Sequence, residues 1–122
     1  MEYVLDGRSV HLEHLSASEV RQELTRHTDE TSPFLIGWGD GKTSFGDLYL
    51  WTQAGRALLE LYEHREHSAS DPEAVKATGL PDITFQDGLT VPYRETVPLS
   101  KAHAAVMFWL MTGRRDPRLT WD

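Results

Sequence analysis

Residues 97–113, Val97-Pro98-Leu99-Ser100-Lys101-Ala102-His103-Ala104-Ala105-Val106-Met107-Phe108-Trp109-Leu110-Met111-Thr112-Gly113, decide how this chain is built. Ser100 is a favoured N-cap residue and Gly113 a favoured helix stop, so the pattern predicts an apolar helix between them. A β-prone entry precedes the helix, and Trp121 marks a short final strand. The C-terminal part is therefore expected to be tied down and not to trail as a loose tail.

This predicted helix is apolar around most of its circumference. On a helical wheel one side is formed by Ala102, Val106, Trp109 and Leu110, and much of the remainder is covered by Met107, Phe108 and Met111. A helix with so little polar surface is either deeply buried or offers a second apolar face.

Three hairpin signals precede it, each a pair of β-prone runs around turn residues. The paired runs are 3–5 with 9–12, 33–38 with 44–52, and 83–85 with 89–91, joined at Asp6-Gly7, Gly39–Lys42 and Asp87-Gly88. Turns of this composition join antiparallel strands. Residues 56–64 can be read as a further strand by alternation or as a helix by composition, and both readings stay open.

Two further segments complete the layout. Ser16 as N-cap with Glu19 three residues later predicts a first helix from Ala17 to His27. Residues 67–81 are polar and interrupted by Pro72 and Gly79, so they are expected to form a loop with at most one helical turn. Together these elements predict one domain over residues 1–122, an α+β fold whose mostly antiparallel, hairpin-built sheet carries two main helices on one face.

Composition narrows the classes of function. The 122 residues carry a formal net charge of −7 and no cysteine, and no signal peptide or membrane span is evident, so a cytoplasmic protein is expected. Between Glu60 and Glu95 eight acidic residues face three basic ones. This sign disfavours direct nucleic-acid binding, and it suits either a basic protein partner or an acidic surface kept for solubility.

Motifs for catalysis and metal binding are weak. His11 and His14, and His64 and His67, have H-x-x-H spacing, but residues three apart in a strand point to opposite faces. Nucleophile motifs are absent from the sequence, and the Gly37–Lys42 stretch lacks the spacing of a phosphate-binding loop. We therefore expect no catalytic residue, metal or cofactor, and keep an uncharacterised hydrolase as the least favoured alternative.

Alternation along residues 44–52 and 56–64 predicts a surface for a partner. If Leu48, Leu50, Leu59 and Leu61 pack under the helices, the opposite face holds Phe45, Asp47, Tyr49, Trp51, Glu60, Tyr62 and His64. Aromatic rings mixed with carboxylates suit a protein interface. The competing interpretation is that the 67–81 loop or a second core layer covers these aromatics.

The C-terminal quarter resembles the first-numbered family of immunity proteins of bacterial polymorphic toxin systems. The resemblance lies in the Val97-Pro98-Leu99-Ser100 helix entry, Thr112-Gly113, Pro117 and Trp121, and in the general layout of the rest; Pro117 lies one residue later than in many members. The family implies a non-catalytic protein that neutralises one cognate toxin, often a nucleic-acid deaminase, by binding it. The partner would be a toxin domain with a basic nucleic-acid-binding surface, and a small structural or adaptor domain is the alternative.

Overall fold

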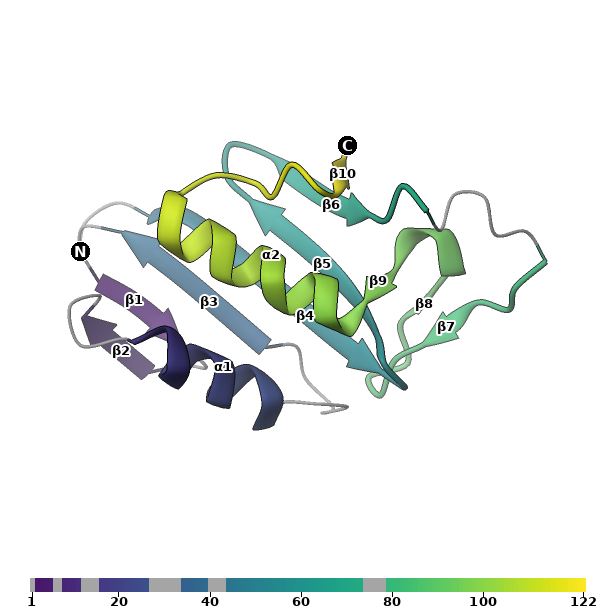
Figure 1. The fold of residues 1–122 in the computed structure, drawn as a ribbon, viewed down its shortest axis with the longest axis horizontal. Helices are drawn as coiled ribbons and strands as arrows, with labels where there is room; N and C mark the ends of the chain where they lie inside the picture. The colour runs from purple at the N-terminus through teal and green to yellow at the C-terminus, as the bar shows by residue number, and fades with distance from the viewer. Residues whose placement is uncertain (1, 6–7, 12–15, 27–33, 40–43, 74–78) are drawn as a thin grey trace.

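The computed structural model describes residues 2–5, 8–11, 16–26, 34–39, 44–73 and 79–122, without the side chains of residues 2–5, 8–11, 17, 20, 38, 39, 44 and 45. Figure 1 shows the elements in chain order: β1 (Glu2–Leu5), β2 (Arg8–His11), α1 (Ala17–Arg26), β3 (Phe34–Gly39), β4 (Ser44–Gln53), β5 (Arg56–Tyr62), β6 (Glu66–Ser70), β7 (Ile83–Thr84), β8 (Thr90–Val91), the 3₁₀ helix η3 (Tyr93–Glu95), β9 (Val97–Pro98), α2 (Leu99–Thr112) and β10 (Thr120–Trp121).

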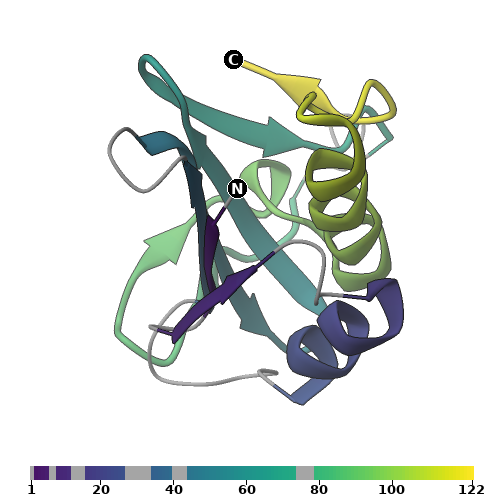
Figure 2. The same cartoon turned by 90° about the vertical axis from the view of Figure 1, so that its left-hand side faces the viewer.

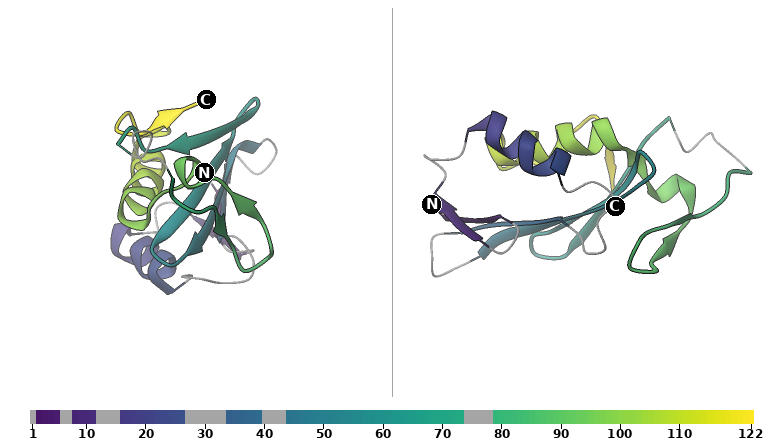
Figure 3. Two further views of the ribbon diagram at one scale, coloured as in Figure 1. Left: turned by 90° about the vertical axis from the view of Figure 1, so that its right-hand side faces the viewer. Right: turned by 90° about the horizontal axis from the view of Figure 1, so that it is seen from below.

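The main sheet has the order β10-β6-β5-β4-β3-β1-β2 in the described residues, and β9 also pairs with β5. Every described strand pair is antiparallel. Both α-helices lie on one face of this sheet, as the view from below in Figure 3 makes clear. The predicted α+β architecture of a hairpin-built sheet with two helices on one face is confirmed.

The open reading of residues 56–64 resolves in favour of a strand. β5 pairs with β4 through a two-residue turn, Ala54-Gly55, in which both residues have positive φ, 49° and 78°. Such turns match the twist of the flanking strands, and the resulting pairing outweighs the helix propensity of alanine, leucine and glutamate.

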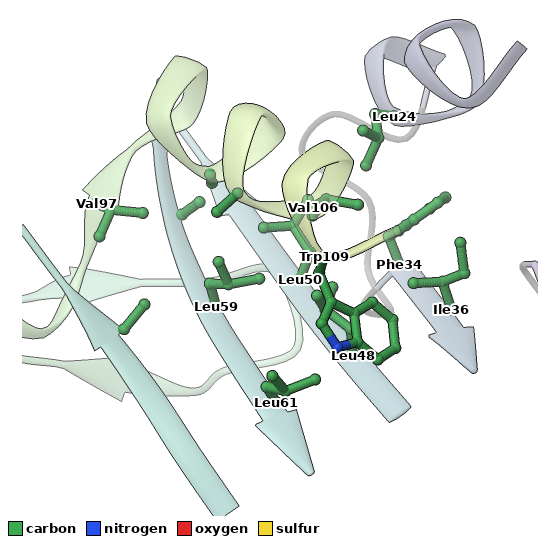
Figure 4. Packing of buried hydrophobic residues seen from close by; sticks show 14 of the residues in the cluster. Leu24, Phe34, Ile36, Leu48, Leu50, Leu59, Leu61, Val97, Val106 and Trp109 are labelled. Carbon is green, nitrogen blue, oxygen red and sulfur yellow. The ribbon is translucent and has the colours of Figure 1, made fainter. Parts of the chain in front are cut away.

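The core lies between the sheet and α2. Leu48, Leu50, Leu59 and Leu61 are each at most 1% exposed, and Figure 4 shows Val106 and Trp109 of α2 directed toward these strands. Leu24 of α1 belongs to the same cluster. The predicted core side of the final helix is confirmed, because Ala102, Val106, Trp109 and Leu110 are all buried.

The ends of α2 differ in how well the sequence predicts them. The stop at Gly113 is confirmed, since this residue adopts φ 71° and its N–H donates to the Trp109 carbonyl. The start at Ser100 is wrong: α2 begins at Leu99, and Pro98 occupies the cap position without a side-chain hydrogen bond. Proline lacks an N–H group and has a fixed φ, so it ends strand β9, and the helix starts two residues earlier than it would with Ser100 as its cap.

The outer side of α2 does carry a second apolar face, since Met111 is 74% exposed and Met107 and Phe108 are half-buried. Within the part of the chain that the structure describes, no helix has both the length and the apolar character needed to cross a membrane.

The expected loop over residues 67–81 is wrong at its start. Residues Glu66–Ser70 form β6, which pairs with β5 on one side and with β10 on the other. His67 and Ala69 are buried on one face, whereas Glu66, Ser68 and Ser70 are more exposed. The sequence pattern does not predict this strand because its residues are mostly polar and its buried positions hold only a histidine and an alanine.

The first helix is confirmed over Ala17–Arg26, while its predicted last residue, His27, lies outside the described residues; the third hairpin is also confirmed. α1 begins after Ser16, whose Oγ accepts the Glu19 N–H at 3.1 Å. β7 and β8 pair as a small separate sheet. Figure 2, with the helices on one side of the main sheet, shows this hairpin on the opposite side.

Candidate partner-binding face

Five of the predicted partner-binding residues share the face of the sheet that lies away from the helices. Strand register pairs Asp47 with Tyr62 and Tyr49 with Glu60, and places Trp51 opposite Leu58. We call Asp47, Tyr49, Trp51, Glu60 and Tyr62 the acidic–aromatic face. The side chain of Phe45, predicted beside them, lies outside the described residues.

The three rings of this face contact one another. Tyr49 and Trp51 are stacked with centroids 5.9 Å apart and an interplanar angle of 20°. Tyr62 meets Tyr49 edge-on, at 5.2 Å and 72°. Both arrangements are favoured aromatic geometries, so the rings form a firm platform across β4 and β5.

A glycine on β3 makes room for the acid at the end of this platform. Gly37 pairs with Asp47, and a Cβ atom added at Gly37 would collide with Asp47 Oδ1. The Asp47 carboxylate therefore lies across the glycine backbone of the neighbouring strand.

Glu60 and Tyr62 are coupled. The Tyr62 hydroxyl donates to Glu60 Oε2 at 2.9 Å. Burial raises the pKa of the Glu60 carboxyl; the Tyr62 hydrogen bond opposes this shift, while the negative charges of Glu66 and Asp122 add to it. Burial and the bond to Glu60 raise the pKa of Tyr62 to about 12, so Tyr62 remains a neutral donor at physiological pH.

The acids of this region have no salt-bridge partner among the described residues. None of the ion pairs found there includes Asp47, Glu60, Glu66 or Asp122. Asp71 and Asp116 differ, because each is buried and paired with a cation, Lys101 and Arg118 respectively. The acidic–aromatic face and the neighbouring Glu66 and Asp122 thus bring together carboxylates that form no salt bridge within the described part of the chain.

A second layer, one of the two covers that the competing interpretation named, lies over one end of this face. Asp87 in the β7–β8 hairpin accepts a hydrogen bond from Trp51 Nε1 at 2.9 Å, and Gln86 donates to Gln53 at 2.8 Å. Leu58 is only 3% exposed although its neighbours Glu60 and Tyr62 on this face are more open. Among the described residues these covering contacts come from the hairpin of residues 83–91, and Tyr62 stays 36% exposed.

His64 is the one predicted face residue that the strand does not carry. β5 ends at Tyr62, and His64 is exposed in the bend between β5 and β6, so alternation does not apply to it. His67 is buried, with Nδ1 2.9 Å from the Asp122 carbonyl oxygen and 3.0 Å from Arg115 Nη1. The side chains of His11 and His14 are not among those that the structure describes. Among the residues that it does describe, no group of three or more potential metal ligands is found.

The structure adds acidic residues that the sequence interpretation missed. Glu66 pairs with Tyr62 across β5 and β6, and Asp122 Oδ1 accepts the Ser68 N–H at 2.7 Å. Alternation of Glu66, Ser68 and Ser70 with His67 and Ala69 was the available signal. Such an arrangement can bind cationic and aromatic groups.

No model of a known protein family matches the chain, and no curated protein matches it.

Proposed function

We propose that this chain is an immunity protein that neutralises a cognate polymorphic toxin by direct binding, occluding the toxin's active site or substrate path. The observation that carries the proposal is the acidic–aromatic face, with three contacting rings beside carboxylates that have no cationic partner in the described residues. The resemblance of the C-terminal quarter to immunity proteins supports the same reading.

The electrostatics of Glu60 support binding over a purely structural role. Its raised pKa means that the folded protein disfavours the ionised form, so ionised Glu60 destabilises the fold at neutral pH. A cationic partner would reverse this penalty by supplying the missing opposite charge. Acids held in this way suit a toxin whose own surface is basic because it binds nucleic acid.

The rings supply the apolar part of such an interface. Interface energy usually resides in a few aromatic or charged anchors surrounded by weaker contacts. Tyr62 is exposed, and Tyr49 is half-buried in direct contact with it. We therefore assign the centre of the interface to Tyr49, Glu60 and Tyr62, with Asp47 beside them and no catalytic residue; the proposal places the complex in the cytoplasm.

The test uses the toxin domain encoded by the neighbouring reading frame. Co-expression with the parent protein should restore growth of cells that produce this domain. Asp47→Asn combined with Glu60→Gln keeps side-chain shape, and we expect it to weaken the purified complex at least tenfold and to reduce rescue.

Glu19→Gln combined with Glu73→Gln is the matched control, because it changes net charge equally at two exposed positions away from the face. It should bind as the parent does. If both double variants keep the parent's melting temperature and weaken binding equally, only overall charge matters and the face is not the interface. If the parent neither binds nor rescues, the immunity function itself is contradicted.

A further inference from the structure

A hollow of about 330 Å³ lies beside the acidic–aromatic face and shares Glu60 with it. Its lining comes from β5, β6, β8, η3 and the C-terminal segment, and includes Leu58, Glu60, Glu66, Ser68, Glu95 and Asp122. We call this the acidic hollow. Nothing in the sequence patterns brings these residues together, because they span residues 58 to 122 and depend on the unexpected strand β6.

The ionisable side chains that line the acidic hollow are all acidic. Four carboxylates and serine and threonine hydroxyls line it, and Leu58 contributes an apolar side chain that is 3% exposed. No ion pair joins any of these carboxylates to a cation within the described part of the chain. Oxygen acceptors spread around an apolar wall match a ligand with several donors and an apolar stem.

The chain's own arginines show how such a group is held. Arg65 donates to the backbone oxygens of Glu66 and Asp122, at 3.3 Å each, next to the hollow. Arg56 lies with its guanidinium carbon 4.1 Å from the centre of the Tyr93 ring and donates to Thr96. The second contact combines an aromatic face with oxygen acceptors, as the hollow and the neighbouring Tyr62 would for an incoming side chain.

We propose that the acidic hollow receives an arginine side chain of the toxin, which anchors the partner beside the acidic–aromatic face. This inference rests on the proposed function. Arginine fits better than lysine because its planar guanidinium presents five donors to separated acceptors, whereas an ammonium group is a compact point charge. The stem would contact Leu58 and the guanidinium would lie among Glu60, Glu66 and Asp122.

A titration without the toxin tests the hollow separately. The probes are three blocked tripeptides, acetyl-Ala-X-Ala-amide, in which X is arginine, lysine or citrulline, the uncharged counterpart of arginine. In ¹H–¹⁵N spectra of the full chain, we expect the arginine peptide to shift the amide signals of residues 66–70 and 120–122 saturably. The citrulline peptide should leave them unchanged, and the lysine peptide should bind more weakly.

Two variants act on the hollow in different ways. Glu66→Gln with Glu95→Gln removes charge and should weaken arginine-peptide binding at least tenfold; Ser68→Phe fills the space and should abolish it. Glu19→Gln on α1 is the control and should bind as the parent does. Spectra of each variant report whether the fold is kept.

Equal binding of citrulline, stronger binding of lysine, or unchanged binding by both folded hollow variants would overturn the assignment. Absence of any saturable shift with the parent would also overturn it. Because the toxin takes no part in this titration, such a failure leaves the immunity proposal standing. Conversely, a parent that binds the arginine peptide but not the toxin would contradict the immunity proposal alone.

Discussion

Trp109 of α2 packs against Gly46 of β4, and removing the Trp109 ring should strongly reduce the free energy of unfolding. Trp109 is 2% exposed, and truncation of a buried tryptophan to alanine costs about 3–5 kcal/mol. A domain of this size has a total stability on the order of 5–15 kcal/mol. Trp109→Ala should therefore remove a large part of the free energy of unfolding.

Gly46 allows a sharper form of this experiment. A Cβ atom at Gly46 would lie 3.1 Å from Trp109 Cζ2 and 3.3 Å from the Tyr62 carbonyl oxygen, so Gly46→Ala overpacks the site and should cost about 1–3 kcal/mol. In the Trp109→Ala background the ring is gone, and the tight contact that remains is the one with the Tyr62 carbonyl oxygen, beside an ordinary van der Waals contact with Glu63 Cγ at 3.6 Å. The double variant should then be at least about 1 kcal/mol more stable than the sum of the two single losses predicts.

The assay is urea unfolding followed by circular dichroism for the parent, the two single variants and the double variant. Comparable m-values would show that all four unfold as the same cooperative unit. Strict additivity, or a stability loss below about 1 kcal/mol for Trp109→Ala, would refute the packing of α2 described above.

Three further predictions concern local contacts. Ser16→Ala should cost about 1 kcal/mol in urea unfolding because Ser16 caps α1, whereas Ser100→Ala should cost less than about 0.5 kcal/mol because Ser100 makes no cap bond. Ala54→Asn should stabilise the protein by about 0.5–1 kcal/mol, since Ala54 adopts φ 49° in a turn that favours Asn-Gly, and an unchanged midpoint would argue against this conformation. Burial alone would raise the pKa of Asp71, but the Glu73 N–H and the Lys101 ammonium outweigh burial and hold that pKa below its usual range. Ionised Asp71 therefore stabilises the fold at pH values above the pKa of Asp71 in the unfolded chain. This stabilisation is lost as the pH falls through the lower pKa of Asp71 in the folded protein. Asp71→Asn should cost about 1–2 kcal/mol at pH 7 and less in acid, and an equal cost at pH 3 and pH 7 would contradict the ion pair.

How far the sequence predicts this fold depends on how strongly each segment is patterned. The hairpin of β3 and β4, with its alternating leucines and aromatics, and the Gly113 stop are strong signals and are confirmed. β6 is missed because its burial involves His67 and Ala69, which carry little hydrophobic signal. Its strand state arises from hydrogen bonding to β5 and β10, and β10 lies about fifty residues away in sequence.

In the candidate site, too, locally patterned features are predicted from the sequence and features that depend on distant contacts are not. Alternation places Asp47, Tyr49, Trp51, Glu60 and Tyr62 on one face, and the register confirms that arrangement, while their role in binding stays a prediction. His64 fails because alternation was extended past the end of the strand. Neither the cover formed by residues 83–91 nor the acidic hollow follows from local pattern, because both depend on contacts between segments distant in the chain.

The most direct test of the binding mode is oxidative footprinting of the chain alone and in complex with its toxin domain. Aromatic and methionine side chains report on two opposite surfaces: Tyr49 and Tyr62 on the acidic–aromatic face, and Met111, which is 74% exposed, on the outer side of α2. We expect complex formation to protect Tyr49 and Tyr62 from oxidation and to leave Met111 as reactive as in the free protein. Protection of Met111 with unchanged oxidation of both tyrosines would place the toxin on the helical side and contradict the proposed binding mode.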